Sequence, residues 1–97
     1  MYSLQELKSN ILSLKPYIQE NYDVDEIYIF GSYARKDQNE NSDIDLLVNF
    51  KKTPDLLTFI EIEEFLSKKL KHVVDLVPKR KLKPQLRDTI LKEAIAI

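Results

Sequence analysis

Three aspartates interrupt apolar stretches of the sequence, and their spacing suggests a metal site. Asp43 and Asp45 stand one residue apart at the start of DIDLLVNF, residues 43–50, and Asp75 divides the apolar pairs of VVDLV. Side chains alternate between the two faces of a strand, so Asp43 and Asp45 would share a face with about 7 Å between their Cα atoms. Carboxylates this close repel one another and raise each other's pKa, and a divalent cation would relieve that repulsion. Hard oxygen ligands of this kind, with other positions left to water and phosphate, suit Mg²⁺.

Each aspartate alone also has an ordinary structural interpretation. An isolated Asp-x-Asp usually belongs to a turn or a helix cap, and Asp75 would be unremarkable at the end of a strand. The functional interpretation depends on a second feature of the sequence. The only glycine of the chain, Gly31, stands directly before Ser32 at the end of an apolar run.

This Gly31–Ser32 turn is typical of an anion site. A strand that ends in glycine and opens a helix at serine would present backbone N–H groups at the positive end of the helix dipole, where phosphate is the usual ligand. Arg35 and Lys36 follow one turn later and could add positive charge. The alternative is that Ser32 only caps the helix and that Arg35 is solvated. Taken with the aspartates, however, the turn predicts a nucleotide site in which Gly31, Ser32 and Arg35 bind the phosphates of a metal-bound triphosphate.

The elements that must position these residues follow from apolar periodicity, β-branched runs and turn residues. Leucine and isoleucine at helical spacing predict a helix over residues 3 to about 20, which Pro16 should end or kink near Lys15. The Thr-Pro-Asp sequence at 53–55 predicts another helix start, with a capping hydroxyl, a proline in the first turn and an acid near the positive helix end. The remaining elements are expected to be a strand at 24–30, a short helix at 32–36, strands at 43–50 and 72–77, and a last helix from Pro84.

This order of helices and strands predicts an α/β (α+β) fold. The 97 residues are expected to form a single domain, 1–97. Helices should flank a small mixed sheet of three strands, or of four if AIAI at 94–97 is an edge strand and not a helix.

Composition narrows the functional classes. The chain has no cysteine, so disulfides and cysteine-bound zinc are excluded, and no apolar run approaches the roughly 20 residues of a membrane span. MYSLQELKSN at the N-terminus alternates polar and apolar residues and does not resemble a secretory signal, so a cytoplasmic protein is expected. The net charge of −1 is unevenly distributed, because residues 67–97 hold 9 of the 15 basic residues and 3 of the 16 acidic ones. That segment is either a solvated face or a surface for an acidic partner.

GSYARKDQNENSDIDLLV, residues 31–48, resembles the G-S-x-A-R…S-D-x-D signature of the DNA polymerase β-like nucleotidyltransferase superfamily. The aspartate of VVDLV resembles that superfamily's third carboxylate, and the compact length resembles the minimal nucleotidyltransferases (MntA-like proteins). The resemblance covers residues 28–93. It implies that Gly31 and Ser32 hold ATP, that Asp43 and Asp45 bind two Mg²⁺ ions, and that Asp75 completes the site of the ion that activates the acceptor. Many members carry a glycine after the arginine, where this chain has Lys36.

The resemblance also implies a biological role. Minimal nucleotidyltransferases act as antitoxins beside a HEPN-domain RNase toxin, so AMP transfer to a tyrosine of such a toxin is expected. The basic segment 67–97 or the first helix could meet this partner, and the sequence does not choose between them. A non-catalytic antitoxin that acts by binding alone is the main alternative, and transfer to a small molecule ranks lower because there is no second domain to form its pocket. Direct binding of nucleic acid is not expected, although KRKLK at 79–83 has the composition of a nucleic-acid patch.

Overall fold

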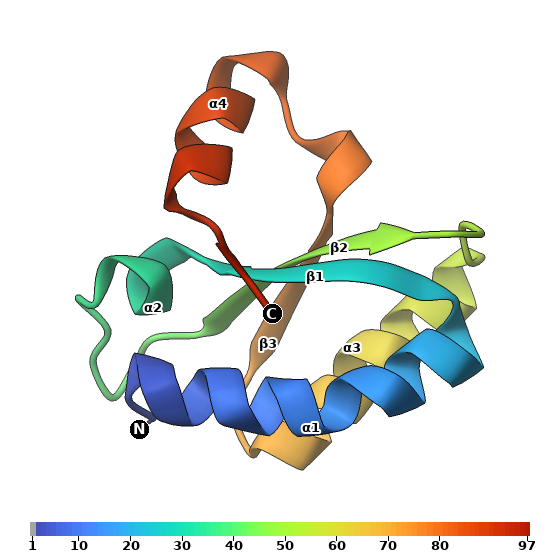
Figure 1. Cartoon of the computed structure of the whole chain (residues 1–97), viewed down its shortest axis with the longest axis horizontal. Helices are drawn as coiled ribbons and strands as arrows, with labels where there is room; N and C mark the ends of the chain where they lie inside the picture. The colour runs from blue at the N-terminus through green and yellow to red at the C-terminus, as the bar shows by residue number, and fades with distance from the viewer. Residues whose placement is uncertain (1) are drawn as a thin grey trace.

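A computed structural model describes residues 2–97. In chain order, the elements are α1 (Leu4–Tyr22), β1 (Val24–Phe30), α2 (Gly31–Arg35), β2 (Ile44–Phe50), α3 (Leu56–Leu70), β3 (Val74–Pro78), the 3₁₀ helix η1 (Lys79–Lys81), α4 (Pro84–Glu93) and β4 (Ile95–Ala96) (Figure 1). This is the predicted succession of elements, with the C-terminal residues in a strand and with one addition, the 3₁₀ helix η1. None of the helices within residues 2–97 has the length and apolar character needed to cross a membrane.

The strands in the described part of the chain form one mixed sheet of four strands in the order β3-β2-β1-β4. β1 is antiparallel to both β2 and β4, and β2 is parallel to β3. The parallel pairing of β2 with β3 requires a crossover, and α3 supplies it. The predicted α/β architecture is confirmed. Of the two alternatives for the C-terminal residues, a helix or an edge strand, the structure has the edge strand.

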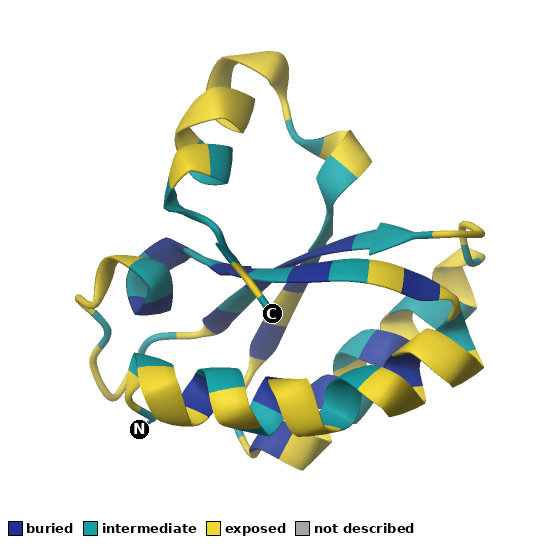
Figure 2. Ribbon diagram, in the orientation of Figure 1, coloured by how far each residue is buried: buried dark blue, intermediate teal, exposed yellow. Residues whose placement is uncertain are grey.

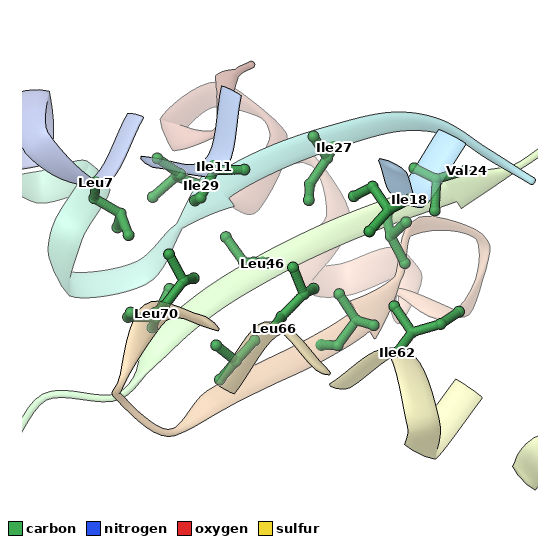
Figure 3. Close-up of a cluster of buried hydrophobic side chains, with 14 of the residues drawn as sticks. Leu7, Ile11, Ile18, Val24, Ile27, Ile29, Leu46, Ile62, Leu66 and Leu70 are labelled. Atoms are coloured by element: carbon green, nitrogen blue, oxygen red, sulfur yellow. The ribbon is translucent and has the colours of Figure 1, made fainter. Parts of the chain in front are cut away.

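α1 and α3 lie together against one face of the sheet and form the core with it (Figures 1 and 3). The alternation of β2 explains this arrangement, since Ile44, Leu46 and Val48 point towards the helices and are fully buried. The helices contribute their apolar stripes to the same core: Leu7, Ile11, Ile18, Ile62, Leu66 and Leu70.

The opposite face of the sheet is covered only in part. η1 and α4 rise away from it on the side opposite α1 and α3 (Figure 1), and α4 buries none of its residues (Figure 2). Asp45 and Asn49 of β2 belong to this second face, because they alternate with the core residues. The open face is therefore where polar side chains can meet a ligand.

The predicted extent of the first helix, residues 3 to about 20, is confirmed, but Pro16 does not end that helix and Thr53 does not cap the third one. α1 does not end near Lys15 but continues through Pro16 to Tyr22, because Ile18, beyond the proline, is fully buried in the core. That packing outweighs the loss of one backbone hydrogen bond at an exposed proline. α3 begins at Leu56, and its N-cap is Asp55, whose carboxylate accepts a hydrogen bond from the Thr58 N–H at 2.8 Å. Thr53 is therefore not the capping residue.

Candidate active site

Asp45 and Asp75 occupy paired positions on the parallel strands β2 and β3. On its other side Asp45 is paired with Phe30, the last residue of β1. Paired residues of a sheet project to the same face, so both carboxylates stand on the open face, beside the point where β1 passes into α2. Sheet pairing thus brings Asp45, Asp75 and the Gly31 turn into one neighbourhood.

Gly31 lies close to the Asp45 side chain, and any other residue there would be strained. Its φ of +72° lies in the left-handed region, a backbone conformation that residues other than glycine rarely adopt. A Cβ at this position would overlap Oδ2 of Asp45 and would lie 3.0 Å from its Cγ. The sequence predicts that Gly31 belongs to a phosphate-binding turn. The structure shows that it also makes room for the Asp45 carboxylate.

Asp45 has the perturbed ionisation expected of a carboxylate among other carboxylates. Burial, followed by the charges of Asp75 and Asp43, raises its pKa to about 6, and Arg35 opposes the rise. Asp43 and Asp75 themselves are exposed. A partly buried acid between two acidic neighbours is the electrostatic setting in which a bound cation is favoured.

The donor set matches Mg²⁺ in chemistry. Within residues 2–97, no three acidic or histidine side chains are arranged closely enough to form a ready metal cage. The three carboxylates are nevertheless hard oxygen donors, and the charges of Asp75 and Asp43 add to burial in raising the pKa of Asp45. Asp43 directly precedes β2, which begins at Ile44 and not at 43 as predicted. These residues therefore fit the metal that the sequence predicts.

Ser32 does not act as the helix cap that the sequence suggested. α2 starts one residue earlier, at Gly31, and its N-cap is Phe30, with no side-chain cap hydrogen bond. Ser32 is half-buried, and among residues 2–97 no hydrogen bond of its hydroxyl is seen. Its hydroxyl is therefore not used by the fold, which leaves it free for a ligand.

The guanidinium of Arg35 is engaged by two carboxylates. It lies 3.3 Å from Asp37 on one side and 3.3 Å from Glu93 of α4 on the other. The side chain of Arg35 remains 48% exposed, so these ion pairs are weak and exchangeable. Sequence reasoning missed Glu93, because 58 positions separate it from Arg35 and no local pattern joins them.

A second polar cluster on the same face was also missed. Tyr28 donates a hydrogen bond of 2.6 Å to Glu26, and Lys79 lies 3.5 Å from Glu26 and 5.0 Å from the centre of the Tyr28 ring. Tyr28 is paired with Leu47, two residues along β2 from Asp45. The only available signal was the two-residue spacing of Glu26 and Tyr28, which places them on one strand face.

Comparison with known proteins agrees with this geometry. The model of the nucleotidyltransferase domain matches residues 11–97. The chain belongs to the nucleotidyltransferase domain family and, within it, to the minimal nucleotidyltransferases.

One relative is the protein adenylyltransferase MntA of Thermococcus cleftensis, 42% identical over 97 residues that cover 100% of this chain and 98% of the relative. The structure of a proposed minimal nucleotidyltransferase aligns with a TM-score of 0.84 at 32% identity, covering 99% of this chain and 97% of that one.

Two similar structures are complexes. A toxin–antitoxin structure with AMP-PNP aligns with a TM-score of 0.76 at 30% identity, covering 92% of this chain and 70% of that one. A complex of a tri-AMPylated HEPN toxin of Shewanella oneidensis with its MNT antitoxin aligns with a TM-score of 0.69 at 26% identity, covering 92% and 69%.

Proposed function

We propose that this chain is a cytoplasmic protein adenylyltransferase that transfers AMP from ATP to a tyrosine hydroxyl of a HEPN-domain toxin and thereby neutralises it. The observation that carries the proposal is the meeting of Asp45, Asp75 and Gly31 at one end of the open sheet face. Carboxylates for metal ions and a glycine turn for phosphates are the parts that nucleotidyl transfer requires.

In the reaction, one P–O bond forms and one P–O bond breaks at the α-phosphorus of ATP. The acceptor oxygen forms a new P–O bond, the bond between the α-phosphorus and the bridging oxygen breaks, and pyrophosphate leaves. The hydroxyl proton passes to a base, and Asp75, which is exposed on the open face, is the candidate. Positioning and charge neutralisation supply most of the catalysis in such a step, so no nucleophilic side chain is needed.

Asp43, Asp45 and Asp75 would hold two Mg²⁺ ions. When bound, such ions lower the pKa of an attacking hydroxyl and neutralise the triphosphate. The backbone at Gly31 and the unused hydroxyl of Ser32 would bind phosphate oxygens. Arg35 would join them by exchanging Glu93 or Asp37 for a phosphate.

The relatives support the choice of nucleotide and of acceptor. A relative that matches the full length of this chain is a protein adenylyltransferase. One similar structure contains AMP-PNP, and another pairs an MNT antitoxin with an AMPylated HEPN toxin. A HEPN-domain protein is therefore the acceptor to test first.

The decisive experiment incubates the chain with its cognate HEPN-domain protein, ATP and Mg²⁺, and measures the intact mass of the acceptor. We expect a gain of one or more AMP groups on tyrosine, and we expect it to be lost in Asp45→Asn. Asp25→Asn is the matched control, because Asp25 is an exposed strand aspartate outside the site. Neutralisation of the toxin without any mass gain, equally good in Asp45→Asn, would refute catalysis and leave inhibition by binding alone.

A further inference from the structure

A hollow at the far end of the sheet from the aspartates has an apolar lining. It encloses about 210 Å³ between the ends of β2 and β3 and the start of α3. Phe50, Pro54, Leu56, Phe59 and Pro78 contribute to its walls, and Arg80 and Lys81 of η1 border it. These seven residues are called the α3 groove below.

The first turns of α3 extend this apolar surface into solvent. Leu56 is 73% exposed, Leu57 is 79% exposed and Ile60 is 40% exposed. Single exposed leucines are ordinary, but three large aliphatic side chains within five residues and beside an apolar hollow form a continuous patch. Such a patch is typical of a surface that another molecule covers.

The charges around the α3 groove are mainly positive. Arg80 and Lys81 border it, and Lys52 lines a neighbouring hollow that shares Thr53, Pro54 and Asp55 with it. Two acids also lie around these hollows: Asp55, whose carboxylate already accepts a hydrogen bond from the Thr58 N–H, and Asp23, which lines only the neighbouring hollow, so the basic residues remain in the majority. An occupant with apolar side chains flanked by acidic ones would complement this surface. Nucleic acid fits less well, because the most exposed side chains, Leu56, Leu57 and Ile60, are aliphatic and cannot stack on bases, while Phe50 and Phe59 pack on each other with their ring centres 6.2 Å apart.

The neighbouring edge of β3 cannot accept an added strand. The outward N–H groups of Val74 and Leu76 are bound by Ser67 Oγ at 3.0 Å and by Glu63 Oε2 at 2.9 Å. The next outward position is Pro78, which has no N–H. Because strand addition depends on free donors at the edge, an occupant of this region must bind through side chains, as a helix in a groove does.

We propose that the α3 groove, together with Leu57 and Ile60, docks an acidic amphipathic helix of the acceptor protein. Phe50 lies five residues after Asp45 on β2, so the docking site is about 16 Å from the chemistry at roughly 3.3 Å per residue. The groove would hold the acceptor while its hydroxyl reaches the aspartates. The identity of the acceptor rests on the proposed function; the surface and its mode of binding do not.

The test measures the affinity of the chain for the cognate HEPN-domain protein by calorimetry, without ATP. The variants are Leu57→Lys and the pair Arg80→Glu, Lys81→Glu. The matched controls are Leu12→Ser on α1, where Leu12 is 57% exposed, and the pair Lys68→Glu, Lys69→Glu at the end of α3. Thermal unfolding and AMP-PNP binding are recorded for each protein to verify that the fold and the nucleotide site are intact.

We expect the groove variants to weaken binding by at least about tenfold, the loss typical of a central interface side chain, and the controls to bind like the wild type. Wild-type affinity in the groove variants, or a loss in the Leu12 variant instead, would overturn the proposal. So would absence of binding by the wild type, self-association that Leu57→Lys abolishes, or binding of an RNA oligomer that depends on Arg80. The proposed function is judged separately by the mass gain, so transfer of AMP with unchanged affinity in the groove variants would refute only the docking site.

Discussion

Asp45 and Asp75 face each other across the parallel pair β2–β3, although 30 positions separate them in the chain. Burial, together with the charges of Asp75 and Asp43, raises the pKa of Asp45 to about 6. The same contact that would serve a metal ion therefore disfavours the ionised carboxyl when no ion is bound. Ionised Asp45 should therefore destabilise the metal-free protein, and a bound cation should stabilise it.

Asp45→Asn should raise the free energy of unfolding at pH 7. The carboxyl has a pKa of about 3.9 in an unfolded chain and about 6 in the folded protein, so the folded state binds the proton more tightly. Stability therefore falls as the pH rises from about 4 to about 6. The shift corresponds to about 3 kcal/mol, which solvent screening of this half-buried carboxyl should reduce to a cost on the order of 2 kcal/mol at pH 7. Thermal unfolding in metal-free buffer should show Asp45→Asn above the wild type at pH 7 and near it at pH 4. Equal stability at pH 7 would contradict the raised pKa of Asp45, whether burial or the neighbouring carboxylates cause it.

Mg²⁺ should stabilise the wild type at pH 7. An ion that binds only the folded state adds about 1.4 kcal/mol at ten times its dissociation constant, and protonation of Asp45 should weaken the effect at pH 5. Thermal unfolding with and without MgCl₂ measures this stabilisation, and Asp45→Asn is the comparison. If Asp45→Asn gains as much as the wild type, the ion binds elsewhere.

Gly31→Ala should lower both stability and AMP transfer. The added methyl group would overlap the Asp45 carboxylate, and alanine is strained at φ +72°, so we expect a loss of about 1–3 kcal/mol. Urea unfolding measures this, with Ser32→Ala as the control, because that hydroxyl forms no helix cap. Wild-type stability in Gly31→Ala would show that Asp45 is free to move aside.

Lys71→Gly should make the protein more stable. Lys71 ends α3 with a φ of +56°, a conformation that glycine adopts without strain, so a gain of about 0.5–1 kcal/mol is expected. Lys69→Gly, two positions earlier inside the helix, should instead lose about 1 kcal/mol. Chemical unfolding of both variants distinguishes the two effects, and a loss in Lys71→Gly would contradict the assigned backbone conformation.

Glu63→Ala should leave the Leu76 N–H unpaired and open the edge of β3. A loss of about 1 kcal/mol and concentration-dependent self-association are expected, since a free strand edge pairs readily. Glu64→Ala removes an exposed neighbour on the same helix and should leave both properties unchanged. Unfolding and size-exclusion chromatography at several concentrations provide the measurement. A monomer at all concentrations would show that the edge is protected in another way.

The structure explains why glycine would be favoured at position 36, where this chain has lysine. Lys36 has a φ of +62° and is the C-cap of α2, so the position favours glycine on conformational grounds. A lysine is tolerated there at a modest cost in strain. The lysine at position 36 therefore affects only the end of α2, and the pairing of Asp45 with Asp75 is unchanged.

Local patterns in the sequence predicted most of the helices and strands and two parts of the candidate site, the Asp45 strand and the Gly31–Ser32 turn. Strand alternation placed Asp45 opposite the core residues of β2, and the Gly31–Ser32 pair marked the end of β1. These predictions depend on neighbours within a few residues, where backbone geometry leaves few choices. Predictions based on single residues were less secure: Pro16 did not end α1 and Ser32 did not cap α2, because packing and backbone conformation prevailed over local preference.

Only the tertiary structure decided which distant segments of the chain contact one another. The pairing of β2 with β3, the fourth strand at residues 95–96 and the contact of Arg35 with Glu93 join segments that are far apart in the chain. The exposed start of α3 likewise became visible only once the core had selected Ile62, Leu66 and Leu70 as its buried stripe. Such contacts depend on strand register and on competition for the core, and neither is encoded in a short stretch of residues.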